Sequence, residues 1–330
     1  MAFSSIAKDF NKESIVQAVR DFEYYTKQEL SQRTSLSFPT TSKIVDELVS
    51  VGMIKVLCDK RGDTGGRKAY VYQLDKEYAY SLCIAVAQGG LKAFVINMDN
   101  EMKSHGETVI KGDISAADIL EFVQAQLVQF PRIRSVVIGV PGAVHRGKIF
   151  LIDGFSKLQN CDLQHMAAEK FCVPVAVLNN MNALIAGCGD NRDENIACIH
   201  IGEKGPGCSC LVNGAPVSGF CGFQGELGFS PYDEKRTFRD IALGGYQDVE
   251  MEQYIGRLAI QLITLVNPEQ LMLYLPTGTN RVDIGAYCRR YLPAEVIPQI
   301  VYPDSYEADY IDGLAKTGVH LLFAASNKYD

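Results

Sequence analysis

Residues 85–99, AVAQGGLKAFVINMD, predict a β-hairpin, because two apolar strand-like segments flank the adjacent glycines Gly89 and Gly90. Residues 195–215, NIACIHIGEKGPGCSCLVNGA, have the same order of apolar strand, glycine-bearing turn and second strand. This repeat indicates two α/β lobes of similar build that face a cleft. Adjacent glycines let a backbone approach a phosphate closely, so the hairpins raise the question of phosphoryl transfer.

Two further stretches lie between the hairpins. Residues 133–147, IRSVVIGVPGAVHRG, predict a buried strand that runs into a Pro-Gly turn. Residues 176–187, AVLNNMNALIAG, predict a strand that runs directly into a helix. Ligands of open α/β sheets bind at such strand-to-helix crossings, so we expect a ligand site there.

The first 75 residues predict a winged helix-turn-helix. Apolar residues at helical spacing give a first helix, and a Thr-x-x-Glu capping box opens a second helix that ends at Arg33. A third helix begins after Ser37 and ends near Gly52, and two strands with a glycine-rich tip follow it. The residues that carry these predictions are Ile15, Val16, Val19, Phe22, Thr26, Glu29, Pro39, Ile44, Val45, Leu48 and Val49, with strands at 54–58 and 70–74.

The geometry of this motif predicts binding to double-stranded DNA. A third helix of this kind presents its N-terminal residues to base edges in the major groove, and a basic wing neutralises phosphates. An alternative is that the three helices and the hairpin form a protein-docking module with a solvated basic loop. The predicted DNA contacts are Ser37, Thr40, Thr41 and Lys43 on the helix, and Lys60, Arg61, Arg67 and Lys68 on the wing.

Charge is distributed unevenly along the chain, whose formal net charge is −7. Residues 1–75 contain 11 Lys and Arg against 10 Asp and Glu, whereas the remaining residues contain 21 against 29. The composition, 47% hydrophobic and 22% charged, is typical of a globular protein, and we find neither a signal peptide nor a membrane-spanning run. We therefore expect a cytosolic location, with ten reduced cysteines rather than a disulfide framework.

The order of these motifs resembles the ROK family of repressors and sugar kinases. The resemblance covers essentially the whole chain and is most specific in the DNA-binding region, TTSKIVDELVSVGMIK…TGGRKAYVYQL. Further on it is carried by GVPGAV, LNNMNALIAG, GFQGELGF and LVNPEQLML. It implies an α/β fold in which a winged helix-turn-helix, residues 1–75, precedes an actin-like (ribonuclease H-like) ROK domain, residues 76–330. The lobes are expected at about 76–195, with the C-terminal helix, and 196–310.

The resemblance also implies that kinase activity has been lost. The kinases of the family carry Asp-x-Gly-Gly-Thr in the first hairpin, where this sequence has Ala87 and Leu91 at the Asp and Thr positions. The catalytic Asp of their strand-to-helix motif is Asn180 here, and an amide is not a useful base. Glu203 puts negative charge where the second hairpin of the kinases meets phosphates. We expect no enzyme activity and no cofactor.

Zinc binding is not expected either. Family members carry Gly-Glu-x-Gly-His, whose His joins three cysteines of the following loop around Zn²⁺. Residues 225–229, GELGF, place Phe229 at the His position, and residues 230–245 contain no cysteine. Cys208 and Cys210 lie upstream and do not match that loop, so we interpret them as small strand residues.

The sugar cleft retains some polar residues at the positions that face sugars in the family. These are Asn179, Asn180 and Glu226, an amide and carboxylate set that suits hydroxyl groups. Each could equally be a structural residue, and His145 and His200 are interpreted as structural. The sequence thus predicts a homodimeric or larger repressor of carbohydrate-utilisation genes that binds a palindromic operator and a sugar or sugar-phosphate effector. An active sugar kinase and a protein-interaction scaffold are the alternatives.

Overall fold

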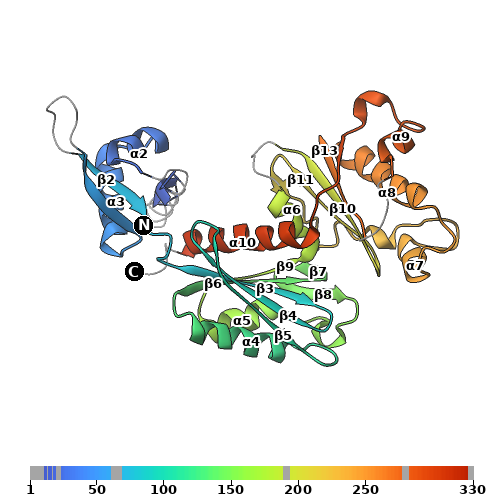
Figure 1. Ribbon diagram of the computed structural model, residues 1–330, viewed down its shortest axis with the longest axis horizontal. Coiled ribbons are helices and arrows are strands. Elements are labelled where there is room, and N and C mark those ends of the chain that lie inside the picture. Colours follow the sequence, from blue (N-terminus) through green and yellow to red (C-terminus); the bar gives the residue numbers. More distant parts are fainter. Residues whose placement is uncertain are drawn as a thin grey trace.

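The computed structural model describes residues 11–12, 14–16, 18–19, 24–60, 69–188, 194–276 and 282–325. In the N-terminal part, the described residues between 11 and 19 are helical, and Ile15, Val16 and Val19 are buried as predicted. Phe22 lies outside the described residues. The elements that follow are α2 (Lys27–Thr34), α3 (Phe38–Ser50), β1 (Ile54–Lys60) and β2 (Ala69–Leu74). Helices followed by an antiparallel hairpin form the predicted winged helix (Figure 1).

The predicted caps are present at both short helices. The Thr26 hydroxyl accepts a hydrogen bond from the Glu29 amide at 3.2 Å, and the Glu29 carboxylate accepts one from the Thr26 amide at 2.6 Å. Ser37 caps α3, and Pro39 lies in the first turn, where its missing N–H costs nothing. These local bonds set the point at which each helix begins.

Two five-stranded sheets follow, and they share one topology. The first has the order β5-β4-β3-β6-β9 and the second the order β12-β11-β10-β13-β14. In each sheet the first three strands in the chain are antiparallel neighbours and the last two pair in parallel. The equivalent order confirms the two similar α/β lobes predicted from the hairpin repeat. The strands are β3 (Tyr80–Ala87), β4 (Gly90–Asn97), β5 (Met102–Val109), β6 (Ile133–Val140), β9 (Val175–Asn179), β10 (Ile196–Gly202), β11 (Gly205–Val212), β12 (Ala215–Pro216), β13 (Gln270–Tyr274) and β14 (Gln299–Val301).

Helices cover both faces of each sheet. On the first lobe, α4 and α5 lie on one face and α10 lies on the other, while α7, α8 and α9 belong to the second lobe (Figure 1). A small hairpin, β7–β8, follows β6 and forms part of the cleft wall. The bounds are α4 (Ala116–Gln129), β7 (Gly142–His145), β8 (Lys148–Ile152), η1 (Ser156–Leu158), α5 (Leu163–Phe171), α6 (Asn180–Cys188), η2 (Leu227–Phe229), α7 (Phe238–Leu243), α8 (Met251–Val266), α9 (Ile284–Cys288), η3 (Ala294–Val296) and α10 (Tyr306–Ala325).

The last helix, α10, connects distant parts of the molecule. It crosses α6 at very short range, because a Cβ on Gly313 would lie 1.7 Å from the Ala183 carbonyl oxygen. One continuous cluster of buried residues includes Leu48 of the winged helix, Cys83 of the first lobe, and Tyr310 and Leu322 of α10. The winged helix and the floor of the cleft therefore share a hydrophobic core. Within the described ranges, no helix is long and apolar enough to span a membrane.

Candidate functional site

Helix α3, the third helix of the winged helix-turn-helix, presents a polar N-terminal end. Ser37 and Lys43 are exposed, and the Ser37 hydroxyl lies 2.8 Å from that of Thr40, which is half-buried. The acidic residues of α3 are neutralised by neighbouring helices, because Lys27 binds Asp46 and Lys12 binds Glu47. This pairing removes two charges that would otherwise repel phosphates.

Thr41 does not belong to this surface. Its side chain is 0% exposed and packs in the core of the winged helix with Ile44 and Val45, on the opposite side from Lys43. The prediction that Thr41 contacts DNA is therefore wrong. At 100° per residue, Thr41 falls on the same helix face as the apolar residues three, four and seven positions later.

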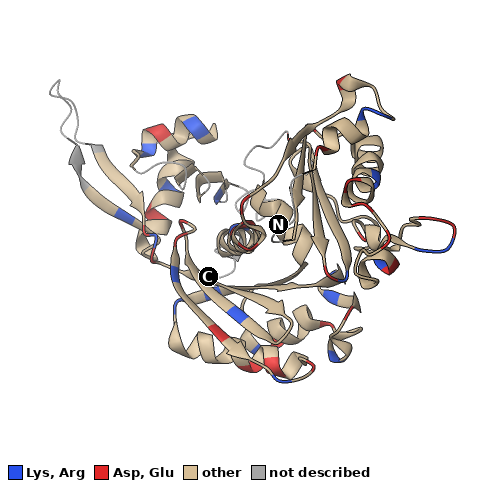
Figure 2. Cartoon of the chain, turned by 45° about the vertical axis from the view of Figure 1, so that its right-hand side comes forward, with Lys and Arg blue, Asp and Glu red and all other residues tan. Residues whose placement is uncertain are grey.

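The wing is only partly described. Lys60 is the last residue of β1, and its side chain is not described, whereas Arg61, Arg67 and Lys68 lie outside the described residues. Their predicted phosphate contacts stay predictions. Figure 2 shows that the helices of the N-terminal part carry both basic and acidic residues rather than a uniformly basic face.

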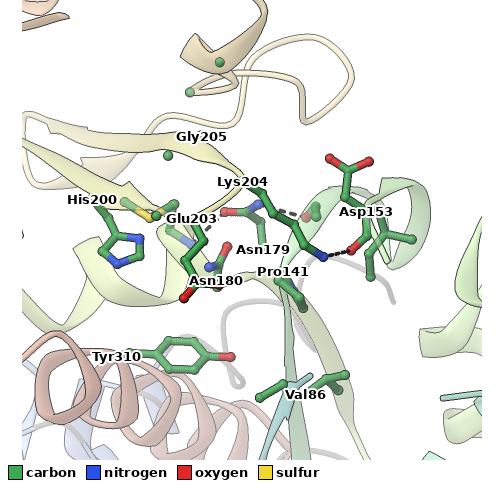
Figure 3. Close-up of a pocket in the computed structure, with 18 of the residues that line it drawn as sticks. Val86, Pro141, Asp153, Asn179, Asn180, His200, Glu203, Lys204, Gly205 and Tyr310 are labelled. Atoms are coloured by element: carbon green, nitrogen blue, oxygen red, sulfur yellow. Dashed lines mark hydrogen bonds between the residues drawn. The ribbon is translucent and has the colours of Figure 1, made fainter. Parts of the chain in front are cut away.

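A cleft of about 580 Å³ lies between the two lobes (Figure 3). Its walls come from the ends of β3, β9 and β10, the β7–β8 hairpin, the loop before η2, and the first turns of α10. This is the place where ligands bind in open α/β sheets, beyond the carboxyl ends of parallel strands. The volume lies within the range of pockets that bury small ligands, about 300–1,000 Å³.

Two adjacent amides at the end of β9 have different environments. Asn179 is almost fully buried, and its Oδ1 accepts hydrogen bonds from the amides of Met181 at 2.7 Å and Asn182 at 3.2 Å. Its Nδ2 donates to the Gly142 carbonyl at 2.8 Å. Asn179 thus fixes the start of α6 and the β7 strand, and because it also lines the cleft, its role as a sugar contact stays a prediction.

Asn180 faces the cleft. Its Nδ2 donates to the Tyr306 hydroxyl at 2.9 Å, and the Tyr306 ring stacks on His200 with centroids 4.2 Å apart. Burial lowers the pKa of His200 to about 4, so this imidazole is neutral at pH 7. The floor of the cleft beside Asn180 is therefore aromatic and uncharged.

Glu226 lies on the second lobe, immediately before η2. Burial, together with the nearby charge of Asp153, raises the pKa of its carboxyl group, while Arg239 partly offsets this. No described residue donates a hydrogen bond to its side chain. A largely buried acceptor without a partner is suited to hydroxyl groups of a ligand.

The first glycine turn is explained by the sheet. Gly90 pairs with Val109 of β5, and a Cβ on it would lie 2.2 Å from the Thr108 carbonyl oxygen. Leu91 is 1% exposed and packs into the core of the first lobe. Close strand packing therefore accounts for this glycine without a phosphate.

Sequence reasoning missed a contact between the lobes. The Asp153 carboxylate of the first lobe binds Arg239 of α7 at 2.6 Å, and its carbonyl oxygen accepts a hydrogen bond from Lys204 at 3.2 Å. By itself, the Asp153-Gly154 pair signals only a turn. The partners lie 51 and 86 positions away in the sequence, so only the fold brings them together.

The described parts of the chain contain no cluster of three or more His, Cys, Asp and Glu side chains that could hold a metal ion. Cys208 and Cys210 are buried in the core of the second lobe, and Phe229 is partly exposed beside Arg239.

Comparisons with known proteins agree with this architecture. The xylose repressor of Bacillus subtilis (strain 168) is 23% identical over 71% of this chain and 63% of its own length. The xylose repressor of Caldicellulosiruptor bescii is 24% identical over 69% of this chain and 60% of its own length. The alignments thus span less than two thirds of each repressor.

Solved structures show the same fold. A ROK family transcriptional regulator, homologous to the Escherichia coli MLC protein, superposes with a TM-score of 0.76 over 97% of this chain and 98% of its own, at 17% identity. A putative N-acetylmannosamine kinase from Listeria monocytogenes gives a TM-score of 0.60 over 74% and 98%, also at 17% identity. Residues 83–243 match the sequence model of the ROK family. The chain therefore contains a ROK family domain.

Proposed function

We propose that this protein is a DNA-binding transcriptional repressor of carbohydrate-utilisation genes that senses a sugar or sugar phosphate in its cleft. The observation that carries the proposal is the continuous core that joins a winged helix to α10, whose first turns line the cleft. The likeness to proteins named xylose repressor supports it. A ligand that favours one arrangement of the lobes can thus change DNA affinity through packed side chains.

On the DNA side, residues 1–75 form the proposed binding domain. Ser37, Thr40 and Lys43 are the proposed contacts to bases and phosphates, together with Lys60, Arg61, Arg67 and Lys68 of the wing. One winged helix reads few base pairs, so a homodimer on a palindromic operator supplies the specificity.

On the effector side, residues 76–330 form the proposed sensing domain. Asn180 and Glu226 are the proposed contacts to sugar hydroxyl groups, since both face the cleft with unused acceptor atoms. Release of DNA by a hundredfold requires about 2.7 kcal/mol of coupling, which is within the range of known allosteric proteins.

The protein is not proposed to be an enzyme. Transfer of a phosphoryl group needs a carboxylate base and donors for the phosphates, and the corresponding positions carry Asn180, Ala87, Leu91 and Glu203. The kinase alternative is supported by structural neighbours named as kinases. Release of ADP from MgATP in the presence of a panel of sugars would establish that alternative.

The experiment that tests the proposal is DNA binding to the region upstream of the gene, titrated with salt and repeated with sugars. We expect sequence-selective affinity that falls as salt increases, because phosphate contacts release counterions. Lys43→Ala is expected to weaken binding to all sequences, whereas Lys170→Ala, on α5 of the first lobe, serves as the control. If neither this region nor a random-site selection gives selective binding, the repressor proposal fails and the scaffold alternative is favoured.

A further inference from the structure

Each cationic side chain that lines the cleft already has an ion-pair or hydrogen-bond partner. Lys92 binds Glu307 at the start of α10, Arg239 binds Asp153 across the cleft at 2.6 Å, and Lys204 donates to the Asp153 carbonyl at 3.2 Å. An anionic ligand would have to displace Glu307 or Asp153 to pair with Lys92 or Arg239, whereas Lys204, whose partner is a neutral carbonyl, keeps its positive charge. The first glycine turn does not replace them, because Gly90 is paired within the sheet.

Two carboxylates line the same cleft without a partner. Within the described residues, neither Glu203 nor Glu226 makes a hydrogen bond or an ion pair. Figure 3 shows the Glu203 side chain directed from the β10–β11 turn into the cleft, towards the side of Asn180. The remaining groups on the floor, Tyr306, Tyr310 and the neutral His200, carry no charge at pH 7.

Two carboxylates and one ammonium group, that of Lys204, therefore lack an ion-pair partner, and the net unpaired charge of the cleft is negative. A phosphate would therefore meet two carboxylates against a single uncompensated cation, and like charges weaken binding. A sugar hydroxyl group, in contrast, can donate to either carboxylate and satisfy an acceptor that now lacks a partner.

We propose that the cleft takes an unphosphorylated sugar, and that Glu203, with Glu226, is the residue that excludes sugar phosphates. The inference rests on the proposed function and narrows its effector to sugars that carry no anionic group. Glu203 is the specificity-determining residue, because it is exposed at the tip of a turn and has no structural partner.

Calorimetric titration of the full chain, without DNA, tests this inference. The probes are matched pairs: D-glucose, D-mannose and N-acetylglucosamine, each with its 6-phosphate, and D-xylose with its 1-phosphate. We expect one free sugar to bind, and its phosphate to bind at least about tenfold more weakly. Glu203→Lys should narrow this ratio by about tenfold or more through tighter binding of the phosphate.

Glu234→Lys is the matched control, because Glu234 is an exposed loop residue outside the cleft and the charge change is the same. A phosphate that binds the unaltered protein as tightly as its free sugar overturns the inference. So do equal effects of the two Lys variants, or the absence of binding by every probe. Selective DNA binding that survives any of these results would leave the repressor proposal standing, whereas sugar binding without DNA binding would reject that proposal alone.

Discussion

Replacement of Gly313 by alanine should separate α10 from α6 and disturb the floor of the cleft. The new Cβ would lie 1.7 Å from the Ala183 carbonyl oxygen and 2.9 Å from the Gly187 amide nitrogen. Both neighbours are backbone atoms, so the helices themselves have to move apart by more than an ångström. Overpacking of this kind costs typically about 1–3 kcal/mol, and the severity of the clash places it at the upper end.

Alanine also gains about 1 kcal/mol of helix propensity over glycine, which offsets part of this cost. We therefore expect Gly313→Ala to lower the free energy of unfolding by about 2 kcal/mol. Affinity for the sugar should fall as well, because α10 carries Tyr306, which holds Asn180 in place. Urea unfolding followed by circular dichroism measures the first effect, and calorimetric titration measures the second.

Gly285→Ala is the control. Gly285 lies within α9, and a Cβ there would meet only the ends of the Asp283 and Arg289 side chains, at 3.3 and 3.4 Å. Its stability should change by less than about 1 kcal/mol, in either direction. If Gly313→Ala is as stable as this control, the close crossing of α6 and α10 is not a feature of the folded protein and the reasoning is refuted.

Three further predictions concern the cleft. Burial gives His200 a pKa of about 4 in the folded protein, whereas the unfolded chain has the ordinary value of about 6.5. The free energy of unfolding should therefore fall as the pH drops from about 6.5 to about 4, by at most about 1.4 kcal/mol per pH unit. His200→Gln should remove this slope in urea unfolding, and His165→Gln, at an exposed position, should leave it unchanged. Asp153→Asn should lower the free energy of unfolding by only about 0.5 kcal/mol, since the ion pair of Asp153 with Arg239 is partly exposed. It should nevertheless speed amide hydrogen exchange in the loop after β8. Unchanged exchange would show that this ion pair does not hold the two lobes together. Asn180→Asp should leave the release of ADP from MgATP at background, because a base alone provides no metal or phosphate ligands. Measurable turnover would contradict the proposed loss of catalysis.

Much of the fold could be predicted because its signals are local. The capping box at Thr26, the Ser37 cap and the glycine hairpins depend on residues a few positions apart, and α2 and α3 each begin at the residue after the predicted cap. The hairpin repeat likewise predicted two lobes of similar build, since antiparallel neighbours joined by short turns leave little freedom of topology, and the two sheets share one strand order.

The candidate site was predicted less well, because polar residues carry no local sign of their partners. Thr41 and Lys43 are both polar and two positions apart, yet helical geometry buries one and exposes the other. Asn179 and Asn180 are identical in type, but the first is used to cap α6 and the second faces the cleft.

The sequence by itself thus determined the winged helix, the two glycine hairpins, the strand-to-helix crossing and the family resemblance, because backbone geometry and side-chain periodicity act over short distances. Only the tertiary structure decided which charges of the cleft are paired. Arg239 is neutralised by Asp153, and Lys92 by Glu307 at a distance of 215 positions, whereas Lys204 meets only the Asp153 carbonyl; no local pattern connects these residues. The sign of the net charge left in the cleft, and with it the class of ligand that we propose, follows from these long-range pairs.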